Sequence, residues 1–374
     1  MKKALSIMFA LLLLFLLPAC GGEEDDYDGD TPSGGDGGNG DNGGWESQED
    51  KPGKVLQTRG FLGITTLALG QDDTLYVGGV TRADLYSDAS GTADALLVAF
   101  DAKGSELWGK QWDVYKDYDA IEYITIDNNG YIYISGGSHV TFVMKFAPDG
   151  AKIWEQFPEF GGITSLVLDS HQNVYISNYD ESEIIKYSTD GKALQSYKIL
   201  DEPLKPKIVS LAVDSEGNIY VVGQTSESLF AENAGKIDAF LVKLAPDGTQ
   251  LWGKQWGSNE NDYIYSSIID DENNLYVVGN TLFKFSPDGE ITWQQTKKYT
   301  SITIDKDRYI YVATKENGGN IDKYDSNGMH IGSFFMNYSR VMQIVCGNKG
   351  TIYVSSINQK NKQNIIKISS SAIN

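Results

Sequence analysis

The sequence predicts an all-β protein, a seven-bladed β-propeller of four-stranded antiparallel blades closed by an N-terminal strand. Three observations lead to this prediction. The segment "DALLVAFDAKGSELWGKQW" at 94–112 returns as "DAFLVKLAPDGTQLWGKQW" at 238–256. A shorter motif recurs seven times, and self-similarity at a fixed period is typical of repeat architectures. Finally, no segment has the periodicity of an amphipathic helix over a useful length.

The chain begins with a predicted signal peptide at 1–19. Lys2 and Lys3 precede an apolar run from Ala4 to Ala19, which is shorter than the roughly 20 residues of a membrane span. The run ends in Leu-Pro-Ala-Cys, which resembles the lipobox of bacterial lipoproteins. That resemblance implies cleavage before Cys20, a diacylglycerol on its sulfur, acylation with fatty acids such as palmitate, and an outer-membrane lipoprotein. The alternative is an ordinary signal peptide followed by a chance cysteine.

Residues 20–52 are predicted to form a disordered, acidic, Gly-rich tether after the lipidated cysteine. Segment 21–52 holds 10 glycines, 11 acids and one lysine, so it can bury too little apolar surface to offset its chain entropy. Acidic residues soon after a lipidated cysteine resemble the surface-export signals of some Gram-negative lipoproteins. We therefore expect a position on the cell surface, with a periplasm-facing anchor as the alternative.

The charge of the chain argues against one class of partner. The formal net charge is −20 and becomes −22 once the signal peptide with its two lysines is removed. A strongly acidic surface repels phosphate backbones. We expect no nucleic-acid binding.

The propeller is predicted to span 53–374. Its repeated motif is an apolar run, an aspartate, a polar turn and an aliphatic-Tyr-aliphatic strand. The seven tyrosine anchors are Tyr76, Tyr133, Tyr175, Tyr220, Tyr276, Tyr311 and Tyr353. Six residues before five of them stands an aspartate, which we interpret as a side-chain cap of the turn. Each unit, with a mean length of about 46 residues, reads as four strands, A to D.

The two ends of the predicted propeller complement each other. The seventh unit ends at its third strand, "NIIKISSSAIN", and lacks a fourth. Segment 53–61, "GKVLQTRGF", aligns with the fourth strand of the first unit. We expect it to complete the last blade, because this pairing removes an exposed sheet edge.

Residues 238–281 resemble the bacterial beta-propeller repeat of the SBBP type, with 94–138 matching less well. The resemblance rests on the Asp-Ala-Phe strand, the Asp-Gly turn and the Asn-x-Tyr-Val strand. It implies a secreted or surface propeller with no general reaction attached. The segment "AFDAKGSELW" also resembles the quinoprotein-like repeat, which occurs in quinone-dependent dehydrogenases and in a cofactor-free propeller lipoprotein of envelope assembly.

No catalytic or metal-binding constellation is visible, and we expect no cofactor. The three histidines, His139, His171 and His330, have no metal-ligand spacing. Cys346 lies in an apolar run and is interpreted as a core residue. Trp108, Trp154, Trp252 and Trp293 occupy one equivalent position of the fourth strand, and we interpret them as core residues that dock between blades.

Strand alternation places the B–C and D–A loops on one face of the propeller. The long segments 80–93, 113–120, 201–207, 224–237 and 257–263 belong to this face, and long loops on rigid scaffolds commonly bind ligands. The candidate ligand residues are Arg82, Asp84, Tyr86, Tyr115, Asp117, Tyr118, Glu227, Phe230, Asp262 and Tyr263.

The sequence thus predicts a membrane-anchored, monomeric, non-catalytic binding or adhesion module for a protein or glycan. The alternatives are an envelope-assembly scaffold lipoprotein and a propeller hydrolase or lyase. Solvated loops without a partner are the other interpretation of the long segments.

Overall fold

The computed structural model describes residues 45–47, 54–56, 61–88, 92–114, 118–137, 140–159, 161–179, 182–199, 206–314, 319–336, 338, 340–347, 350–358 and 362–373. Within these ranges no helix is long and apolar enough to cross a membrane. The predicted signal peptide and Cys20 lie outside the described residues, as does His139.

Seven antiparallel sheets form seven blades, numbered here in chain order. Blade 1 holds β3 (Gly63–Leu69), β4 (Leu75–Thr81), β5 (Asp94–Phe100) and β6 (Glu106–Trp112). Blade 2 holds β7 (Ile121–Ile126), β8 (Ile132–Gly137), β9 (Thr141–Phe146) and β10 (Lys152–Gln156). Blade 3 holds β11 (Ile163–Leu168), β12 (Val174–Asn178), β13 (Glu183–Tyr187) and β14 (Ala193–Lys198).

The second half of the ring continues the pattern. Blade 4 holds β15 (Lys207–Val213), β16 (Ile219–Thr225), β17 (Asp238–Leu244) and β18 (Gln250–Trp256). Blade 5 holds β19 (Ile264–Ile269), β20 (Leu275–Gly279), β21 (Leu282–Phe285) and β22 (Ile291–Gln295). Blade 6 holds β23 (Tyr299–Ile304), β24 (Ile310–Thr314), β25 (Ile321–Tyr324) and β26 (His330–Phe334).

Blade 7 joins the two ends of the chain, as predicted. Its sheet runs in the order β1 (Trp45–Ser47), β2 (Lys54–Leu56), β29 (Gln363–Ser369), β28 (Thr351–Ile357) and β27 (Arg340–Cys346). A 3-10 turn, η1 (Ser370–Ala372), follows β29. Strand β2 lies within the predicted closing segment 53–61 and takes the fourth position, with Val55 opposite Ile366.

Most of the predicted tether at 20–52 lies outside the described residues. Within it, β1 pairs antiparallel with β2, with Glu46 opposite Val55. Without β1, the outer edge of the short strand β2 would be unpaired. Strand β1 pairs with that edge as the fifth strand of the sheet.

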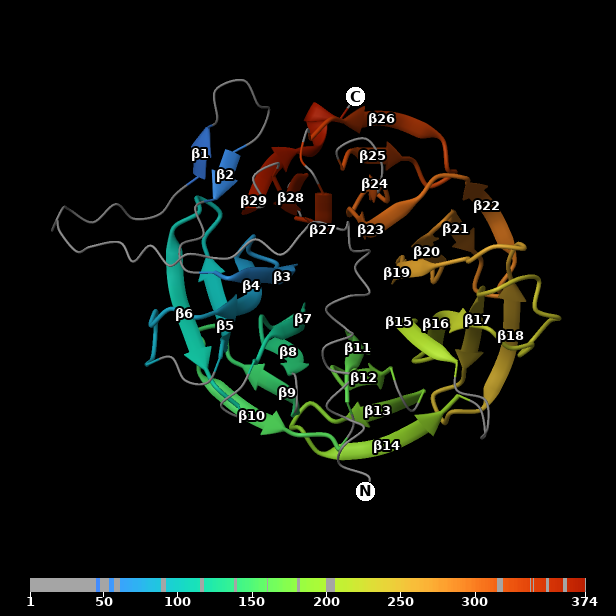
Figure 1. The fold of residues 1–374 in the computed structure, drawn as a ribbon, viewed down its shortest axis with the longest axis horizontal. Coiled ribbons are helices and arrows are strands. Elements are labelled where there is room, and N and C mark those ends of the chain that lie inside the picture. The colour runs from blue at the N-terminus through green and yellow to red at the C-terminus, as the bar shows by residue number, and fades with distance from the viewer. Residues whose placement is uncertain are drawn as a thin grey trace, which may run out of the picture. The chain divides into compact units, whose positions relative to one another are not determined.

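The A strands lie innermost around the axis and the D strands lie outermost (Figure 1). Every residue of the B strand β4 and of the C strand β5 is buried, whereas the D strand β6 is largely exposed or half-buried. The central strands are covered on both faces by neighbouring blades, which explains their continuous apolar sequences.

The seven predicted tyrosine anchors are all buried, with exposed fractions of 4% or less. The aspartate before the anchor caps the A–B turn, as predicted. In blade 2, Asp127 Oδ1 accepts the amides of Asn129 and Tyr131, each at 2.9 Å, and Oδ2 accepts the Tyr133 hydroxyl at 3.2 Å. The same bonds recur in blades 3, 5 and 6. These carboxylates are therefore structural.

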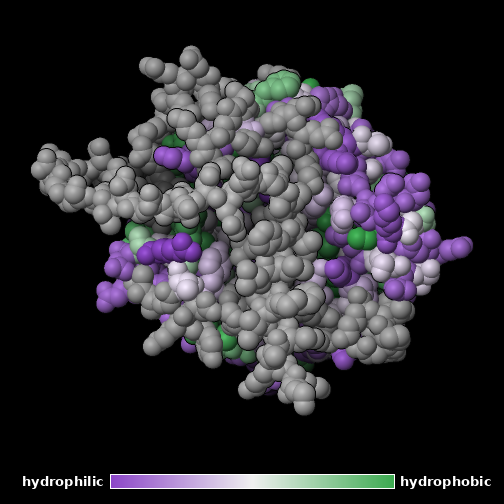
Figure 2. All heavy atoms as spheres, in the orientation of Figure 1, coloured by the Kyte–Doolittle hydropathy of each residue, from purple (hydrophilic) through white to green (hydrophobic). Residues whose placement is uncertain are grey.

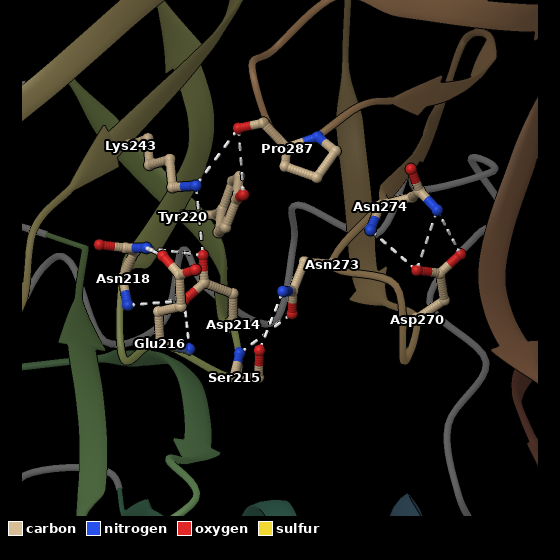
Figure 3. Close-up of polar contacts among 10 residues, drawn as sticks. All are labelled: Asp214, Ser215, Glu216, Asn218, Tyr220, Lys243, Asp270, Asn273, Asn274 and Pro287. Atoms are coloured by element: carbon tan, nitrogen blue, oxygen red, sulfur yellow. Dashed lines mark hydrogen bonds and ion pairs between the residues drawn. The ribbon is translucent and has the colours of Figure 1, made fainter.

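A lysine on the C strand completes this repeated unit and links adjacent blades. In blade 4, Lys243 Nζ lies 3.2 Å from Asp214 Oδ2 and 4.8 Å from the centre of the Tyr220 ring. Figure 3 shows Lys243 and Tyr220 both pointing at the Pro287 carbonyl, in the C–D turn of blade 5, which they reach at 3.2 and 3.4 Å. Lys145 and Lys284 reach the next blade in the same way.

The tryptophans dock between blades, as predicted. Each packs on the tyrosine anchor of its own blade, with ring centroids 5.9 to 6.2 Å apart. Each also lies against the C–D turn glycine of the following blade; the four pairs are Trp108 with Gly150, Trp154 with Gly191, Trp252 with Gly289 and Trp293 with Gly328. These glycines have φ between +80° and +83°, so both the turn and the ring exclude a side chain there.

Candidate functional site

The two longest B–C loops are each joined to the adjacent D–A loop. In blade 1, Ala93 and Tyr118 form a parallel bridge, and the Asp119 amide donates to the Ala93 carbonyl at 2.9 Å. In blade 4, Ile237 and Asn261 form the equivalent bridge, with a bond of 2.8 Å from the Asp262 amide to Ile237. The loops therefore share one face, as strand alternation predicted, and we call it the loop face.

Tyr86 contacts its own blade. A Cβ on Gly109 of β6 would lie 1.9 Å from the Tyr86 ring, and the Tyr86 hydroxyl donates to Glu106 at 2.7 Å. Gln111 Oε1 accepts the Leu85 amide at 3.0 Å, and its Nε2 donates to the buried Asp94 at 2.8 Å. We call this arrangement the loop clamp of blade 1.

Blade 4 repeats the clamp with a phenylalanine. A Cβ on Gly253 would lie 2.4 Å from the Phe230 ring. Gln255 Oε1 accepts the Leu229 amide at 2.7 Å, and its Nε2 donates to Asp238 at 2.9 Å. Tyr86 and Phe230 therefore lie on the outermost strands and hold the loops in place, away from the axis.

The other candidate residues of the loops differ in exposure and contacts. Arg82, Asp84 and Glu227 are exposed on the B–C loops. Asp262 accepts the Ser258 amide at 2.6 Å and hydroxyl at 2.9 Å, so it shapes its own loop. Tyr118 is half-buried beside Ala93 and Ala120. Tyr115 and Asp117 lie outside the described residues.

Tyr263 lies at the end of the D–A loop, directly before the A strand β19. It is 37% exposed, and its ring centroid lies 6.5 Å from that of Tyr265 on β19. Tyr265 belongs to a set of residues that the sequence analysis did not single out.

Every A strand carries a one-residue β-bulge at the same position. In β3, for example, Ile64 pairs with Gly79 and Thr66 with Gly78, so Thr65 is the extra residue. The seven bulge residues are Thr65, Glu122, Thr164, Val209, Tyr265, Thr300 and Met342. Side chains of a regular strand point at the two faces of its sheet, here towards adjacent blades, and a bulge re-aims one of them.

The seven bulge residues differ in their surroundings: Thr164 is buried, and Val209 packs against the core formed by blades 4 and 5. In β3, Thr65 is exposed between the buried Ile64 and Thr66, and the A strands line the centre of the ring (Figure 1). Each bulge residue stands five positions before the turn residue, as Glu122 does before Asp127 and Thr65 before Gly70. This constant spacing is the feature of the sequence from which the seven bulge positions could have been predicted.

Two charged side chains stand near the start of their A strands, at the end next to the loop face. Glu122 and Arg340 are half-buried, and burial raises the pKa of Glu122 to about 8. Burial also lowers the pKa of Arg340, against the influence of Tyr265. Burial and the Glu122 charge together raise the pKa of Tyr118.

A cavity of about 430 Å³ lies at the other end of the A strands, among the A–B turns of blades 2 to 5. Asp127, Asp169 and Asp214 line it, but their oxygens cap turns. The remaining polar side chains of its wall are neutral; they are Thr125, Asn128, Ser170, Gln172, Ser215 and Ser267. Elsewhere, over blades 4 and 5 at the right of Figure 2, the described surface is mainly hydrophilic.

The comparisons support the fold. The beta-propeller repeat family (SBBP) matches residues 207–231, the A and B strands of blade 4, directly before the segment 238–281 on which the resemblance was noted. No curated protein sequence matches this chain. A repeat of the predicted type is thus present in this unit.

Solved structures of virginiamycin B lyase and streptogramin B lyase share the architecture. A catalytically inactive variant of virginiamycin B lyase from Staphylococcus aureus, solved with quinupristin, has a TM-score of 0.61 at 12% identity, over 84% of this chain and 97% of that chain. The selenomethionine form of that lyase gives 0.57 at 10% identity, over 82% and 94%. A streptogramin B lyase gives 0.57 at 13% identity, over 83% and 95%. At such identity the likeness shows the fold alone.

Proposed function

We propose that this protein is a membrane-anchored, surface-exposed, non-catalytic module that binds a protein or glycan through its loop face. The observation that carries the proposal is the pair of clamped and bridged loops in blades 1 and 4. A loop held by its own blade loses little conformational entropy on binding, so it presents a pre-organised surface.

The residues available for contact on these loops are charged or aromatic. Arg82, Asp84 and Glu227 are exposed, and Tyr263 offers a ring beside polar groups. Such a mixture suits hydrogen bonding to a glycan or the rim of a protein interface. The acidic composition supports a partner other than nucleic acid.

A glycan array probed with the labelled mature protein tests the binding role. The loop-face variant Arg82→Ala/Asp84→Ala/Glu227→Ala/Tyr263→Ala should lose most of the wild-type signal while keeping the melting temperature. A control variant with equally exposed residues of the opposite face, Lys103→Ala/Asp149→Ala/Lys192→Ala/Asp288→Ala, should retain the signal. Loss of signal in the control alone would contradict the assignment of the face.

The anchor is part of the same proposal and is tested separately. Lipidation of Cys20 would give stable membrane attachment, because two or more acyl chains bury enough methylene groups. Labelled palmitate should enter the wild type and not Cys20→Ser. Protease shaving of intact cells should remove the propeller if it faces outwards, and should spare it if the anchor faces the periplasm, as an envelope-assembly scaffold would require.

A propeller lyase is the second candidate function. Two observations favour it: the solved lyases share the fold, and burial raises the pKa of Glu122, on the innermost strand of blade 2, to about 8, within the range in which a general acid or base works. Incubation with quinupristin, the compound named with the staphylococcal lyase, separates the two. We expect the compound to stay intact. Consumption that Glu122→Gln abolishes would replace the binding role with a catalytic one.

A further inference from the structure

Each A strand begins at the loop face, and the residue two positions before its bulge stands at or directly before the start of the strand. In chain order these seven residues are Gly63, Ala120, Gly162, Lys207, Tyr263, Lys298 and Arg340. The three that carry a positive charge belong to blades 4, 6 and 7. We call Lys207, Lys298 and Arg340 the cationic arc.

The blades that carry the cationic arc are neighbours. From β15 to β27, adjacent A strands hold residues whose Cα atoms lie within 8 Å of each other, and these strands form one side of the innermost ring (Figure 1). Gln224, which pairs with Lys207, donates to the Ile264 carbonyl of blade 5 at 3.1 Å. Thr300 of blade 6 donates to the Val341 carbonyl of blade 7 at 3.5 Å. These contacts hold the loop-face ends of the strands together.

The charges of the cationic arc are not neutralised by the rest of the described chain, although its formal net charge is −20. None of the three side chains forms an ion pair with a described residue. Lys207 contacts a ring instead, since its Nζ lies 4.7 Å from the centre of the Tyr179 ring. Arg340 is half-buried. A partly desolvated guanidinium without a counter-charge is costly, and a bound anion would offset that cost.

The described acids that stand close to the arc, along the chain or at a bulge, are engaged elsewhere. Asp262 accepts the amide and the hydroxyl of Ser258 at 2.6 and 2.9 Å. Asp322 is only 1% exposed and forms an ion pair with Lys297. Glu122 stands on β7, whose neighbouring A strands are β3 and β11. The arc therefore keeps its positive charge available to a ligand.

Tyr263 adds an aromatic surface to the arc. It holds the same strand position in blade 5, between Lys207 of blade 4 and Lys298 of blade 6. Its side chain is 37% exposed, and its ring centroid lies 6.5 Å from that of Tyr265. A tyrosine ring offers an apolar face on which a sugar can pack and a hydroxyl for hydrogen bonds.

We propose that the cationic arc binds an oligosaccharide that carries carboxylate groups, with a sugar ring packed on Tyr263. The inference rests on the proposed function, because it names the class of glycan that the loop face binds. Cations on neighbouring blades match charges that repeat along a chain better than they match a single small anion. An acidic peptide offers similar charges but no sugar ring to cover Tyr263. Arg340 can hold a carboxylate with two hydrogen bonds, and the lysines act as point charges.

Binding by the arc predicts a strong dependence on salt. The Debye length falls from about 10 Å at 0.1 M to about 3 Å at 1 M ionic strength, so the affinity should fall at least about tenfold over that range. This measurement uses the wild-type chain and needs no variant to fold. An affinity that salt leaves unchanged would overturn the proposal.

The experiment titrates the full mature chain calorimetrically with tetragalacturonate, and with its methyl ester as the same chain without charge. We expect the acid to bind and the ester to give no measurable heat. The arc variant should weaken binding at least about tenfold, because it removes three charge contacts; it is Lys207→Gln/Lys298→Gln/Arg340→Gln. Its melting temperature is checked because Arg340 is half-buried. If that variant unfolds, the exposed pair Lys207→Gln/Lys298→Gln repeats the test.

A matched control removes the same charge from exposed lysines of blades 1 and 3, away from the arc. It is Lys110→Gln/Lys192→Gln/Lys198→Gln. The control should change the affinity by less than about twofold, because these charges lie beyond the screening length from the ligand. Equal weakening in both variants would reduce the effect to net charge and overturn the proposal.

Three further outcomes decide between the alternatives. Equal binding of the methyl ester would show that charge is not recognised and would overturn the inference. Tighter binding of tetraglutamate than of tetragalacturonate would also overturn it, because the partner would then be an acidic peptide. A glycan array with signals for neutral glycans alone would contradict this inference and leave the proposed function in place, whereas an array without any signal would contradict a glycan partner altogether.

Discussion

The indole ring of Trp154 in blade 2 lies against Gly191 in blade 3, so closely that a Cβ on Gly191 would lie 2.7 Å from the ring. The Trp154 indole nitrogen also donates to the Thr189 carbonyl at 3.0 Å, and Lys145 donates to the same oxygen at 3.0 Å. One aromatic ring and one lysine thus attach blade 2 to blade 3.

This contact predicts the cost of a methyl group at Gly191. Gly191→Ala should destabilise the protein by about 2–4 kcal/mol, because the φ of +83° costs an L-residue about 1–2 kcal/mol and the ring must also move. Gly217→Ala is the matched control, since its φ is +82° but its nearest neighbour would lie at an ordinary 3.5 Å. Equal losses in denaturant unfolding would contradict the role of Trp154.

The loop clamp predicts a local effect without a global one. Gln111→Ala removes the acceptor of the Leu85 and Tyr86 amides. Hydrogen exchange at these two amides should accelerate at least tenfold, while the melting temperature changes by only a few degrees. Lys110→Ala, at the exposed neighbouring position, should change neither. Unchanged exchange in Gln111→Ala would show that the Tyr86 ring alone holds the loop.

A strained turn predicts a stabilising substitution. Gln172 has a φ of +63°, in the left-handed region where glycine is favoured, and Gly130 and Gly217 fill the equivalent turn position in blades 2 and 4. Gln172→Gly should raise the free energy of unfolding by about 0.5–1 kcal/mol. Gln172→Ala keeps the strain and should give no such gain. Denaturant titration of both variants checks this, and a loss in the glycine variant would contradict it.

The raised pKa of Glu122 predicts a stability that falls with pH. The folded pKa, about 8, lies above the ordinary value of 4.5, so the stabilisation is fully present below pH 4.5 and is lost as pH rises through 8. The slope between these values should approach 1.4 kcal/mol per pH unit. Thermal unfolding from pH 5 to 8 should therefore show a steeper decline for the wild type than for Glu122→Gln. Identical slopes would contradict the burial of this group.

The closing sheet predicts which N-terminal truncations the protein tolerates. Removal of 43–61 deletes β1 and β2 and leaves β29 as a free edge, so we expect aggregation or a clear loss of melting temperature. Removal of 21–42 leaves both strands in place and should change the melting temperature little. Light scattering and calorimetry compare the two, and similar behaviour would contradict closure by β2.

The sequence by itself determined the architecture of the propeller. The spacing of Tyr133 after Asp127, repeated around the chain, required the same turn and the same buried strand each time, because a capping aspartate and a core tyrosine act within one hairpin. The closing strand was also predictable, since a third strand without a fourth leaves an edge that must be covered. These predictions rest on interactions between residues that lie close together in the sequence.

Only the tertiary structure decided where the chemistry lies. Tyr86 and Phe230 belong to loops that the sequence predicts to be exposed, yet each ring packs on a glycine of the outermost strand of the same blade. No local sequence pattern specifies such a contact between a loop and a distant strand. Glu122 stands inside an unremarkable strand in the sequence. In the fold it is the extra residue of a one-residue bulge and is half-buried, because pairing with β8 and packing of adjacent blades bring together strands that are distant in the sequence.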